Sequence, residues 1–411
     1  MWARLLSIFL KRLIKKGTLI VIYPDGRAAR YGDETSSPVT VRLHPRSLAR
    51  KLLINPDLAF GEAYTDGTLT VDEDNLYSLI ELLVINLAHQ PHVWHYRWLT
   101  RLRWLYRRLA QSNPAERARK NVAHHYDLSG ALYDLFLDAD RQYSCAYFRR
   151  PDESLEAAQE NKKAVIAGKL LLKPGQQVLD IGCGWGGLGL HLARNHGVGV
   201  TGVTLSREQH KVAEERAQAE GLGDRARFHL QDYREVAGTF DRIVSVGMFE
   251  HVGVPHYHEF FTTLRDRLAD DGVALLHTIG RADGPGATNP WIAKYIFPGG
   301  YSPALSEVLA IAERSGLYVT DVEVLRLHYA ETLKAWRDRF ETNLDRVHAI
   351  YDERFCRMWR FYLIASELAF RLNGHVVFQI QLARKQDAVP LTRDYLITHE
   401  TQDKIGAGNA A

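Results

Sequence analysis

Residues 178–187, VLDIGCGWGG, decide the fold of this chain. The apolar, β-branched run around Asp180 predicts a buried strand, and the four glycines after it predict a tight turn into a helix. Glycine permits positive φ angles and places no Cβ in the way of a ligand, while a helix N-terminus presents unpaired N–H groups. The glycine spacing differs from the G-x-G-x-x-G pattern of dinucleotide-binding folds. The segment therefore predicts a small-ligand site of another kind at the end of a strand.

The segments around this turn alternate between strand-like and helix-like patterns. Helical periodicity at 161–172 precedes the turn, and a long helical block covers 331–372. Further helices are expected to begin near Ser206 and Pro255. Strands are predicted at 199–204, 227–230, 240–246, 273–279 and 318–325, and an alternating strand contains Val376, Phe378, Ile380 and Leu382. This order predicts an α/β fold with a doubly wound, mostly parallel sheet.

The first part of the chain has the pattern of a separate, smaller domain. With 411 residues and 46% hydrophobic content, the chain is long enough for two or three domains. Short strand-like pieces and turn signals such as Pro24-Asp25-Gly26 predict an α+β arrangement that ends near Asn113-Pro114. We therefore expect an N-terminal α+β domain over residues 1–114 and a catalytic domain over residues 115–405.

The net charge of +3 conceals an asymmetry along the chain. Residues 1–120 contain 19 Lys and Arg against 11 Asp and Glu, whereas the remainder is acidic. A basic front indicates an anionic partner, either nucleic acid or a membrane with acidic lipids. Within residues 94–108, tryptophan and tyrosine interleave with arginine. This composition is typical both of a core helix with a basic face and of a segment at lipid headgroups, and we expect membrane contact there.

Cysteine usage and the N-terminus indicate the compartment. Cys145, Cys183 and Cys356 are widely spaced and form no C-x-x-C pair, so neither a disulfide framework nor a zinc site is predicted. A reducing cytosol fits this pattern. Residues 1–16 are interrupted by five basic side chains, are too short to span a bilayer and lack an obvious cleavage site. We expect a chain that is soluble or peripheral on a membrane.

Polar residues follow the ends of the predicted strands. In a doubly wound sheet, ligands bind beyond the carboxyl ends of the strands, so these residues are candidates for a site. The polar side chains that end five successive strands are Asp180, Thr204, Asp232, Glu250 and His277.

Eight motifs, in this order along the chain, resemble those of the cyclopropane-fatty-acyl-phospholipid synthases. They are HHYDLSGALYDLFLD (124–138), QYSCAYF (142–148), VLDIGCGWGG (178–187), GVTLSREQ (202–209), DRIVSVGMFEHVG (241–253), LLHTIG (275–280), WIAKYIFPGG (291–300) and HYAETL (328–333). The resemblance covers most of residues 115–372, and the basic N-terminal domain matches the extra domain of the phospholipid-acting members. It implies a Rossmann-like class I methyltransferase sheet with a helical insertion.

The resemblance also implies that S-adenosyl-L-methionine (AdoMet) binds at the glycine-rich turn, with Asp232 placed to accept a hydrogen bond from the adenine amino group. An acidic residue normally holds the ribose hydroxyls at the end of the second strand, but Thr204 stands there, and Gln209 is the available substitute. The residues that we expect to bind AdoMet are Tyr143, Ser144, Asp180, Gly182, Gly184, Thr204, Gln209, Asp232 and Tyr233.

Members of this family are also similar in binding a bicarbonate ion beside the AdoMet methyl. The matching positions are Cys145, Glu250, His277, Tyr329 and the backbone N–H of Ile279. A cis alkene is a weak nucleophile, so its attack on the sulfonium methyl requires alignment in a dry pocket. Loss of a proton from the new methyl then closes the ring, and bicarbonate is the expected base. No metal is expected.

These observations predict an enzyme that transfers a methylene group from AdoMet to the cis double bond of an acyl chain in a membrane phospholipid. We expect a homodimer, cytoplasmic and peripheral on the inner membrane of a bacterium. The alternative is a related acyl-chain methyltransferase with a methyl-branched or mycolate-type product, although mycolate-modifying members generally lack a large N-terminal domain. A nucleic-acid methyltransferase is a rival from another class. The acidic catalytic half and the lack of an Asn/Asp-Pro-Pro-Tyr-like motif argue against it, so the expected partners are phospholipid acyl chains and an anionic membrane surface, with no nucleic acid.

Overall fold

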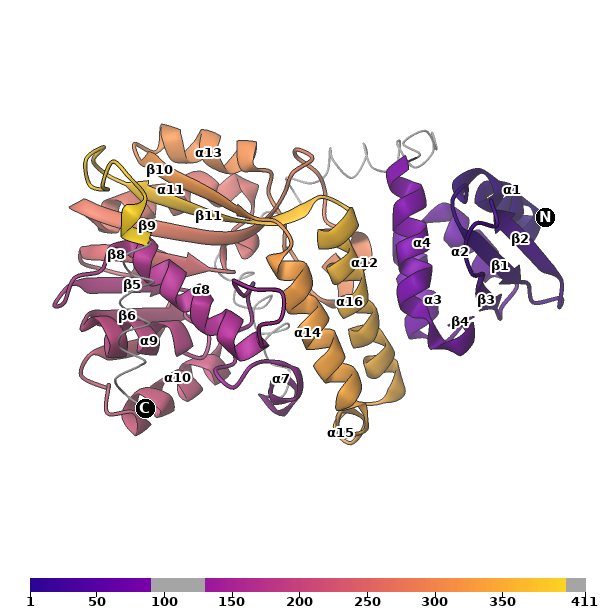
Figure 1. Ribbon diagram of the computed structural model, residues 1–411, viewed down its shortest axis with the longest axis horizontal. Helices are drawn as coiled ribbons and strands as arrows, with labels where there is room; N and C mark the ends of the chain where they lie inside the picture. Colours follow the sequence, from indigo (N-terminus) through magenta and orange to yellow (C-terminus); the bar gives the residue numbers. More distant parts are fainter. Residues whose placement is uncertain (90–129, 397–411) are drawn as a thin grey trace. The chain divides into compact units, whose positions relative to one another are not determined.

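The computed structural model describes residues 1–89 and 130–396 (Figure 1). These residues form two compact units. Within the described ranges, the first unit contains residues 1–89, 287–298 and 333–374, and the second contains residues 130–286, 299–332 and 375–396. Three segments that are distant in the sequence therefore share the first unit.

The second unit is built on a seven-stranded sheet with the order β10-β11-β9-β8-β5-β6-β7. Its strands are β5 (Gln177–Ile181), β6 (Gly199–Thr204), β7 (Ala226–Leu230), β8 (Phe240–Val246), β9 (Leu268–Arg281), β10 (Tyr318–Leu325) and β11 (His375–Ala383). Strands β5 to β9 pair in parallel, whereas β11 is antiparallel to both of its neighbours. The predicted α/β class and doubly wound sheet are confirmed, and the alternating strand at the end of the chain is the antiparallel one.

The strand order places a crevice at the end of β5. Asp180 on β5 aligns with Gly202 of β6 on one side and with Val244 of β8 on the other. The connection that leads out of β5 runs to β6 on one side, and the chain later returns to β8 on the other side. Such a switch point leaves room for a ligand beyond the carboxyl ends of the strands. The glycine-rich turn follows β5 directly at this point.

Helices cover both faces of this sheet because successive strand residues point to opposite sides. Leu179 and Ile181 join one apolar cluster, which includes side chains of α11 (Tyr257–Arg267) and α13 (Leu305–Arg314). Val178 joins the other, with α8 (Leu155–Leu170), α9 (Gly187–His196) and α10 (Arg207–Ala219). The hydroxyl of Ser206 caps α10 by accepting from the Gln209 N–H at 3.3 Å, as its position before the helical pattern predicts.

The first unit combines a small sheet with helices. Its strands, in the order β2-β1-β3-β4, are β1 (Thr18–Ile22), β2 (Ala28–Gly32), β3 (Val39–Leu43) and β4 (Leu69–Val71). Its helices from the start of the chain are α1 (Trp2–Leu13), α2 (Leu48–Ile54), α3 (Pro56–Thr65) and α4 (Leu76–His89). The predicted α+β character is confirmed. Strand β2 was not predicted, because most of its residues are exposed and lack an alternating apolar pattern.

Helices from the later part of the chain complete the core of the first unit. They are α12 (Pro290–Tyr295), most of α14 (His328–Thr342), α15 (Leu344–His348) and α16 (Glu353–Leu372). The Phe361 ring of α16 lies 5.7 Å from that of Phe60 and 4.6 Å from that of Trp291. A Cβ on Gly61 would come within 2.5 Å of the Trp291 ring, so glycine permits this close packing.

One difference from the sequence-based expectations concerns a helical block, and several other predictions fall outside the described residues. The block predicted as one helix over 331–372 is three helices, because the chain leaves the helical conformation after Thr342 and the Asp352 side chain caps a new helix. The boundary predicted between residues 114 and 115 lies outside the described residues, as do the segment 94–108 and the first part of the 124–138 motif. Those predictions remain predictions. Among the described residues, no helix combines the length and apolar character that crossing a membrane requires.

Candidate active site

A pocket lies at the carboxyl ends of β5, β6, β7 and β8, where the sheet topology leaves the crevice. All of the residues predicted to bind AdoMet line it: Tyr143, Ser144, Asp180, Gly182, Gly184, Thr204, Gln209, Asp232 and Tyr233. The structure therefore gathers side chains that are up to 90 positions apart into one cavity. Further lining residues were not predicted from the sequence, among them Gln142, Trp185, Arg234, Met248 and His251.

The glycine-rich turn needs glycine for two separate reasons. Gly182 has a φ angle of +82°, and a Cβ there would lie 2.7 Å from the Met248 Cβ. Gly187 has an ordinary φ angle, but a Cβ there would lie 2.4 Å from the Gln142 Nε2 and 2.6 Å from an Asp140 oxygen. The first glycine allows the turn to form, and the second allows the 138–145 loop to pass close to the start of α9.

Side chains at the ends of β6 and β7 are linked to their neighbours. The Thr204 hydroxyl donates to the Gln209 Oε1 at 2.9 Å, so the two residues expected near the ribose are in direct contact. The buried Asp232 carboxylate accepts from Arg234 Nε at 2.9 Å and Nη2 at 2.7 Å. The expected adenine contact of Asp232 would thus be made by a carboxylate that Arg234 already holds in place.

Asp180 carries a buried oxygen that a ligand can satisfy. Its side chain is 1% exposed, and its Oδ2 has no hydrogen-bond partner in the part of the chain that the structure describes. Burial raises the pKa of Asp180 to about 7, and the nearby Lys162 acts in the opposite direction. A cationic or N–H-bearing ligand in the pocket would favour the ionised carboxylate.

The five residues predicted to hold bicarbonate all belong to the second unit, on four elements. Glu250 lies in a short 3₁₀ turn, Phe249–His251, directly after β8, and its Oε1 accepts from the Ile279 N–H of β9 at 2.6 Å. Cys145 lies in the loop before α8, and the next residue, Ala146, donates its N–H to the Thr332 hydroxyl at 3.0 Å. Thr332 lies on α14, three residues after Tyr329 and one turn after the first residue of the helix. The structure thus joins Glu250 to Ile279 directly and the Cys145 loop to the Tyr329 helix.

One detail differs from the expected arrangement. The backbone N–H of Ile279 was expected to face a bound anion, but it donates to Glu250 in this structure. The other Glu250 oxygen, Oε2, is buried and accepts no hydrogen bond from the described residues. Burial raises the pKa of Glu250 to about 7, while the hydrogen bond from Ile279 opposes the rise. The polar atom of this pair that remains open is therefore the Glu250 Oε2, whereas the Ile279 N–H donor is already engaged.

The His277 ring has a defined tautomer. Lys169, an ammonium that only donates, contacts Glu323 and also donates to the Gln379 Oε1 at 2.6 Å. The Gln379 Nε2 must therefore face His277, where it lies 3.1 Å from Nδ1. Because Nε2 of glutamine only donates, Nδ1 is the acceptor and the ring proton resides on Nε2. Burial lowers the pKa of His277 to about 3, with Lys162 and Lys169 adding to the effect, so the ring is neutral.

Cys145 is an uncharged thiol. Its side chain is 1% exposed, and its sulfur donates to the Ala146 carbonyl at 3.3 Å. Burial raises the pKa of the thiol above its ordinary value, so the thiolate, which is the nucleophilic form, is disfavoured at neutral pH. Cys145 is thus suited to pack against a reacting group and to donate a weak hydrogen bond.

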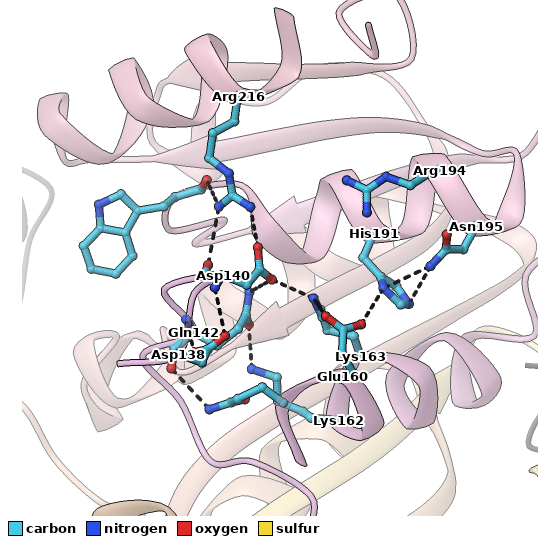
Figure 2. A network of polar contacts seen from close by, with 12 residues as sticks. Asp138, Asp140, Gln142, Glu160, Lys162, Lys163, His191, Arg194, Asn195 and Arg216 are labelled. Carbon is cyan, nitrogen blue, oxygen red and sulfur yellow. Dashed lines mark hydrogen bonds and ion pairs between the residues drawn. The ribbon is translucent and has the colours of Figure 1, made fainter. Parts of the chain in front are cut away.

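Lys162 of α8 supports the wall of the pocket and was not predicted from the sequence (Figure 2). The side chain is fully buried, and its Nζ donates to Gln142 Oε1 at 2.6 Å and to Ser144 Oγ at 2.8 Å. One turn earlier, the Gln159 amide donates to the Ser144 carbonyl at 3.0 Å. Burial lowers the pKa of Lys162 to about 8, while Asp138 and Asp140 favour the charged form. The inward face of α8 therefore holds the loop that lines the pocket.

Asp140, within the same loop, forms two further contacts that hold the loop in place. Its carboxylate accepts from Lys163 Nζ at 2.7 Å and pairs with Arg216 of α10. Arg216 also donates to the Trp185 carbonyl of the glycine-rich turn at 3.1 Å. Asp138 closes the loop, because its carboxylate accepts from the Gln142 N–H at 2.8 Å and from the Asp140 N–H at 3.1 Å. These contacts connect α8, α10 and the turn after β5 through one loop.

The sequence does contain a signal for this support. Leu155, Gln159, Lys162, Ile166 and Lys169 recur at helical spacing and are all buried on α8. Polar residues at such core positions are rare unless they have partners. A helix with three polar residues on its inward face therefore indicates a polar site behind it. Among the described residues, no group of three or more His, Cys, Asp or Glu side chains is arranged to hold a metal ion.

Comparisons with known proteins extend over most of the chain. A family model described as mycolic acid cyclopropane synthetase matches residues 113–380, and a domain of unknown function matches residues 5–89. The chain is 40% identical over 350 residues to a cyclopropane-fatty-acyl-phospholipid synthase of Escherichia coli, covering 85% of this chain and 89% of that protein. It is 34% identical over 397 residues to a tuberculostearic acid methyltransferase of Mycobacterium tuberculosis, covering 93% and 92% of the two chains.

Solved structures agree with these matches. The cyclopropane synthase MmaA2 from Mycobacterium tuberculosis has a TM-score of 0.62 and 34% identity, with 66% of this chain and 99% of that chain covered. The mycolic acid cyclopropane synthase CmaA1, in complex with S-adenosylhomocysteine (SAH) and CTAB, gives the same values. The family resemblance and the methyltransferase fold expected from the sequence are thereby confirmed.

Substitution of Lys162 by methionine is expected to weaken AdoMet binding about ten- to a hundredfold, because a charge-assisted hydrogen-bond donor to two pocket residues is lost. Isothermal titration with AdoMet measures the change. Lys211→Met is the control, because that lysine lies on α10, is 76% exposed and pairs with Glu215 rather than with the 138–145 loop. Equal affinity of folded Lys162→Met and wild-type protein would contradict the supporting role.

Substitution of Gln379 by glutamate is expected to reverse the His277 tautomer. A carboxylate beside Lys169 only accepts hydrogen bonds, so the ring proton would move to Nδ1. Nitrogen NMR of histidine-labelled protein should report the exchange of the two ring signals, and turnover should fall at least about tenfold. Gln381→Glu, buried on the same face of β11, is the control and should leave the His277 signals unchanged.

Replacement of Glu250 by glutamine is expected to stabilise the fold at high pH. The folded pKa is raised, so wild-type stability is complete below the ordinary glutamate pKa and is lost as pH rises toward about 7. The variant should therefore be more stable by roughly 2–3 kcal/mol at pH ~8 and nearly equal at pH ~4.5. Urea unfolding at both pH values tests this. Glu214→Gln on the exposed face of α10 should show no such pH-dependent gain.

Proposed function

The chain belongs to the mycolic acid cyclopropane synthetase family and is an AdoMet-dependent methyltransferase, and we propose that it converts the cis double bond of a phospholipid acyl chain into a cyclopropane ring. The observation that carries this proposal is that Glu250, His277 and Cys145 are all buried and each adjoins a residue that lines the pocket. These neighbours are His251 and Ser144 in the sequence and Val246 in the register of β8 with β9, and burial disfavours the charged form of all three side chains. Buried, uncharged side chains of this kind suit a reaction with an apolar substrate in a site without water.

The pocket at the end of β5 is proposed to hold AdoMet. The orphaned Asp180 Oδ2 supports this assignment, since AdoMet carries a positive sulfonium and an ammonium group. The contact between Thr204 and Gln209 offers polar groups where the ribose is expected, in place of the usual acidic side chain. The sulfonium methyl is the group transferred, and the alkene carbon that attacks it becomes bonded to that methyl while SAH leaves.

His277 and Cys145 do not compete with the alkene for this methyl. The Nδ1 lone pair of His277 is engaged by Gln379, and Nε2 carries the ring proton, so neither nitrogen is free to attack. Cys145 stays a thiol because burial raises the pKa of its sulfur. A site that handles an alkylating agent and a carbocation requires such protected side chains.

We propose that bicarbonate is the base of the reaction, as the family resemblance implies. When bound, it would accept the proton that the new methyl loses as the ring closes. The His277 Nε2–H is a donor suited to an anion, and Cys145 and Tyr329 are further candidates to hold it. The open Oε2 of Glu250 suits the hydroxyl of the same ion. Ionised Glu250 would accept from that hydroxyl, whereas protonated Glu250, the state that its raised pKa supports, would instead donate from Oε2 to an oxygen of the ion.

The place of action is proposed as well. We propose a cytoplasmic enzyme that is peripheral on a bacterial inner membrane and takes its substrate from that bilayer. The basic N-terminal part of the chain supports contact with acidic lipids. A homodimer is proposed on the resemblance alone.

The alternative is an enzyme whose product is a methyl-branched acyl chain. It is favoured by the 93% coverage of this chain in the match to a tuberculostearic acid methyltransferase. That match includes most of the N-terminal part, so the presence of this part does not separate ring formation from branching.

The experiment is incubation of the purified chain with AdoMet and vesicles that contain cis-unsaturated phosphatidylglycerol. We expect the acyl chains to gain about 14 mass units, one CH₂, with cyclopropyl proton signals replacing the olefinic ones. Removal of dissolved CO₂ should slow the reaction, and added bicarbonate should restore it. Glu250→Gln should bind AdoMet like the wild type but form no product. A branched product would support the alternative, and turnover by Glu250→Gln at the wild-type rate would refute the site assignment.

A further inference from the structure

We propose that the outer face of α1 is the surface by which this chain docks on an anionic phospholipid bilayer. The inference rests on the proposed function in one respect, because that function supplies the reason for contact with a bilayer. It assigns the contact to a particular helix, which neither the motifs nor the active site identify.

The two faces of α1 have different surroundings. Leu6, Leu10 and Leu13 are buried and attach the helix to the rest of the first unit. On the outer side, Met1, Trp2, Leu5 and Ile8 are exposed by 88%, 38%, 44% and 46%. Positions 1, 5 and 8 recur at helical spacing, so these apolar side chains lie along one stripe that faces solvent. Isolated exposed apolar residues are ordinary, but a continuous stripe on one helix marks an interaction surface.

Basic side chains surround this stripe. Arg4, Lys11, Arg12, Lys15 and Lys16 are all exposed, and no acidic residue precedes Asp25. A helix with an apolar stripe and flanking Lys and Arg is the pattern of an interfacial helix, with apolar side chains below the headgroups and cations among the phosphates. Cations in the last turn also complement the helix dipole, but that effect does not explain the exposed apolar residues.

The fold holds α1 ready for such contact. The Ser7 hydroxyl accepts from the Tyr31 hydroxyl at 2.9 Å. At the end of the helix, the Asn86 side chain accepts from the Lys15 N–H at 2.8 Å and the Lys16 N–H at 2.9 Å. The helix is therefore formed and anchored before it meets a surface, and binding requires no ordering of this segment.

An acidic bilayer fits this face better than two other occupants. A second copy of the chain would bring the same five cations against each other around the stripe. Nucleic acid would attract the cations but offers phosphate rather than apolar partners to Leu5 and Ile8. Only a lipid surface supplies a negative layer and an apolar layer at the depths where the helix presents its cations and its apolar side chains.

The test compares the double variant Leu5→Gln/Ile8→Gln with the wild type in the full-length protein. Co-sedimentation uses vesicles of phosphatidylglycerol mixed with phosphatidylcholine, and vesicles of phosphatidylcholine alone. We expect the variant to bind the acidic vesicles at least about tenfold more weakly, and the wild type to lose binding at high salt or without phosphatidylglycerol. Tyr318→Gln/Val324→Gln is the matched control, since these residues are exposed by 49% and 40% on β10.

Activity measurements separate this proposal from the proposed function. The α1 variant should lose turnover on vesicles but keep wild-type turnover on the same phospholipid dispersed in detergent. Wild-type affinity of the α1 variant for acidic vesicles would overturn the proposal, as would an equal loss in the β10 control. A change in dimer formation with unchanged vesicle binding would assign the face to a second copy and also overturn it. Vesicle binding that depends on α1, without methyl transfer in any form of substrate, would refute only the proposed function.

Discussion

The ammonium group of Lys162 is buried, and the 138–145 loop of the second unit supplies the hydrogen-bond acceptors that this charge requires. A buried charge is strongly unfavourable unless hydrogen bonds and opposite charges surround it. Here the 138–145 loop folds over α8 so that Gln142 and Ser144 accept from Nζ, with Asp138 and Asp140 nearby. The loop then has to pass close to the glycine-rich turn, which explains why Gly187 has no room for a side chain. One buried cation therefore fixes the helix, the loop and the turn as a single wall of the pocket.

Burial also sets the charge state of the site. The pKa values of Asp180 and Glu250 are both raised to about 7, whereas that of His277 is lowered to about 3. In each case desolvation is the largest cause, so an apolar surrounding favours the neutral forms of acids and bases alike. A sulfonium ligand would bring a positive charge into this region and favour ionisation of the nearest carboxyl. The chain thus provides acceptors for positive charge without keeping a permanent anion in a dry cavity.

The sequence predicts the second unit well because central strands such as β8 are largely buried and read as apolar runs, while the edge strand β10 is rich in β-branched residues. Strands β6, β8 and β10 begin and end at the predicted residues. The polar residues at the strand ends indicated the pocket because parallel strands bring their carboxyl ends to one edge. The support behind the pocket was not predictable in this way. Gln379 and His277 are 102 positions apart, and only the fold reveals that Lys169 orients the amide between them.

The grouping of segments in the first unit was equally inaccessible to sequence reasoning, and it affects how the protein is made. The ring of Phe60 packs against Phe361, and Gly61 packs against Trp291. At ribosomal rates of about 5–20 residues per second, the roughly 300 residues between Phe60 and Phe361 take about 15–60 s to synthesise. During that interval the apolar side of α3 has left the ribosome without its later partners. The nascent chain is therefore a natural client for chaperones, and its first-made part is among the last to reach its final packing.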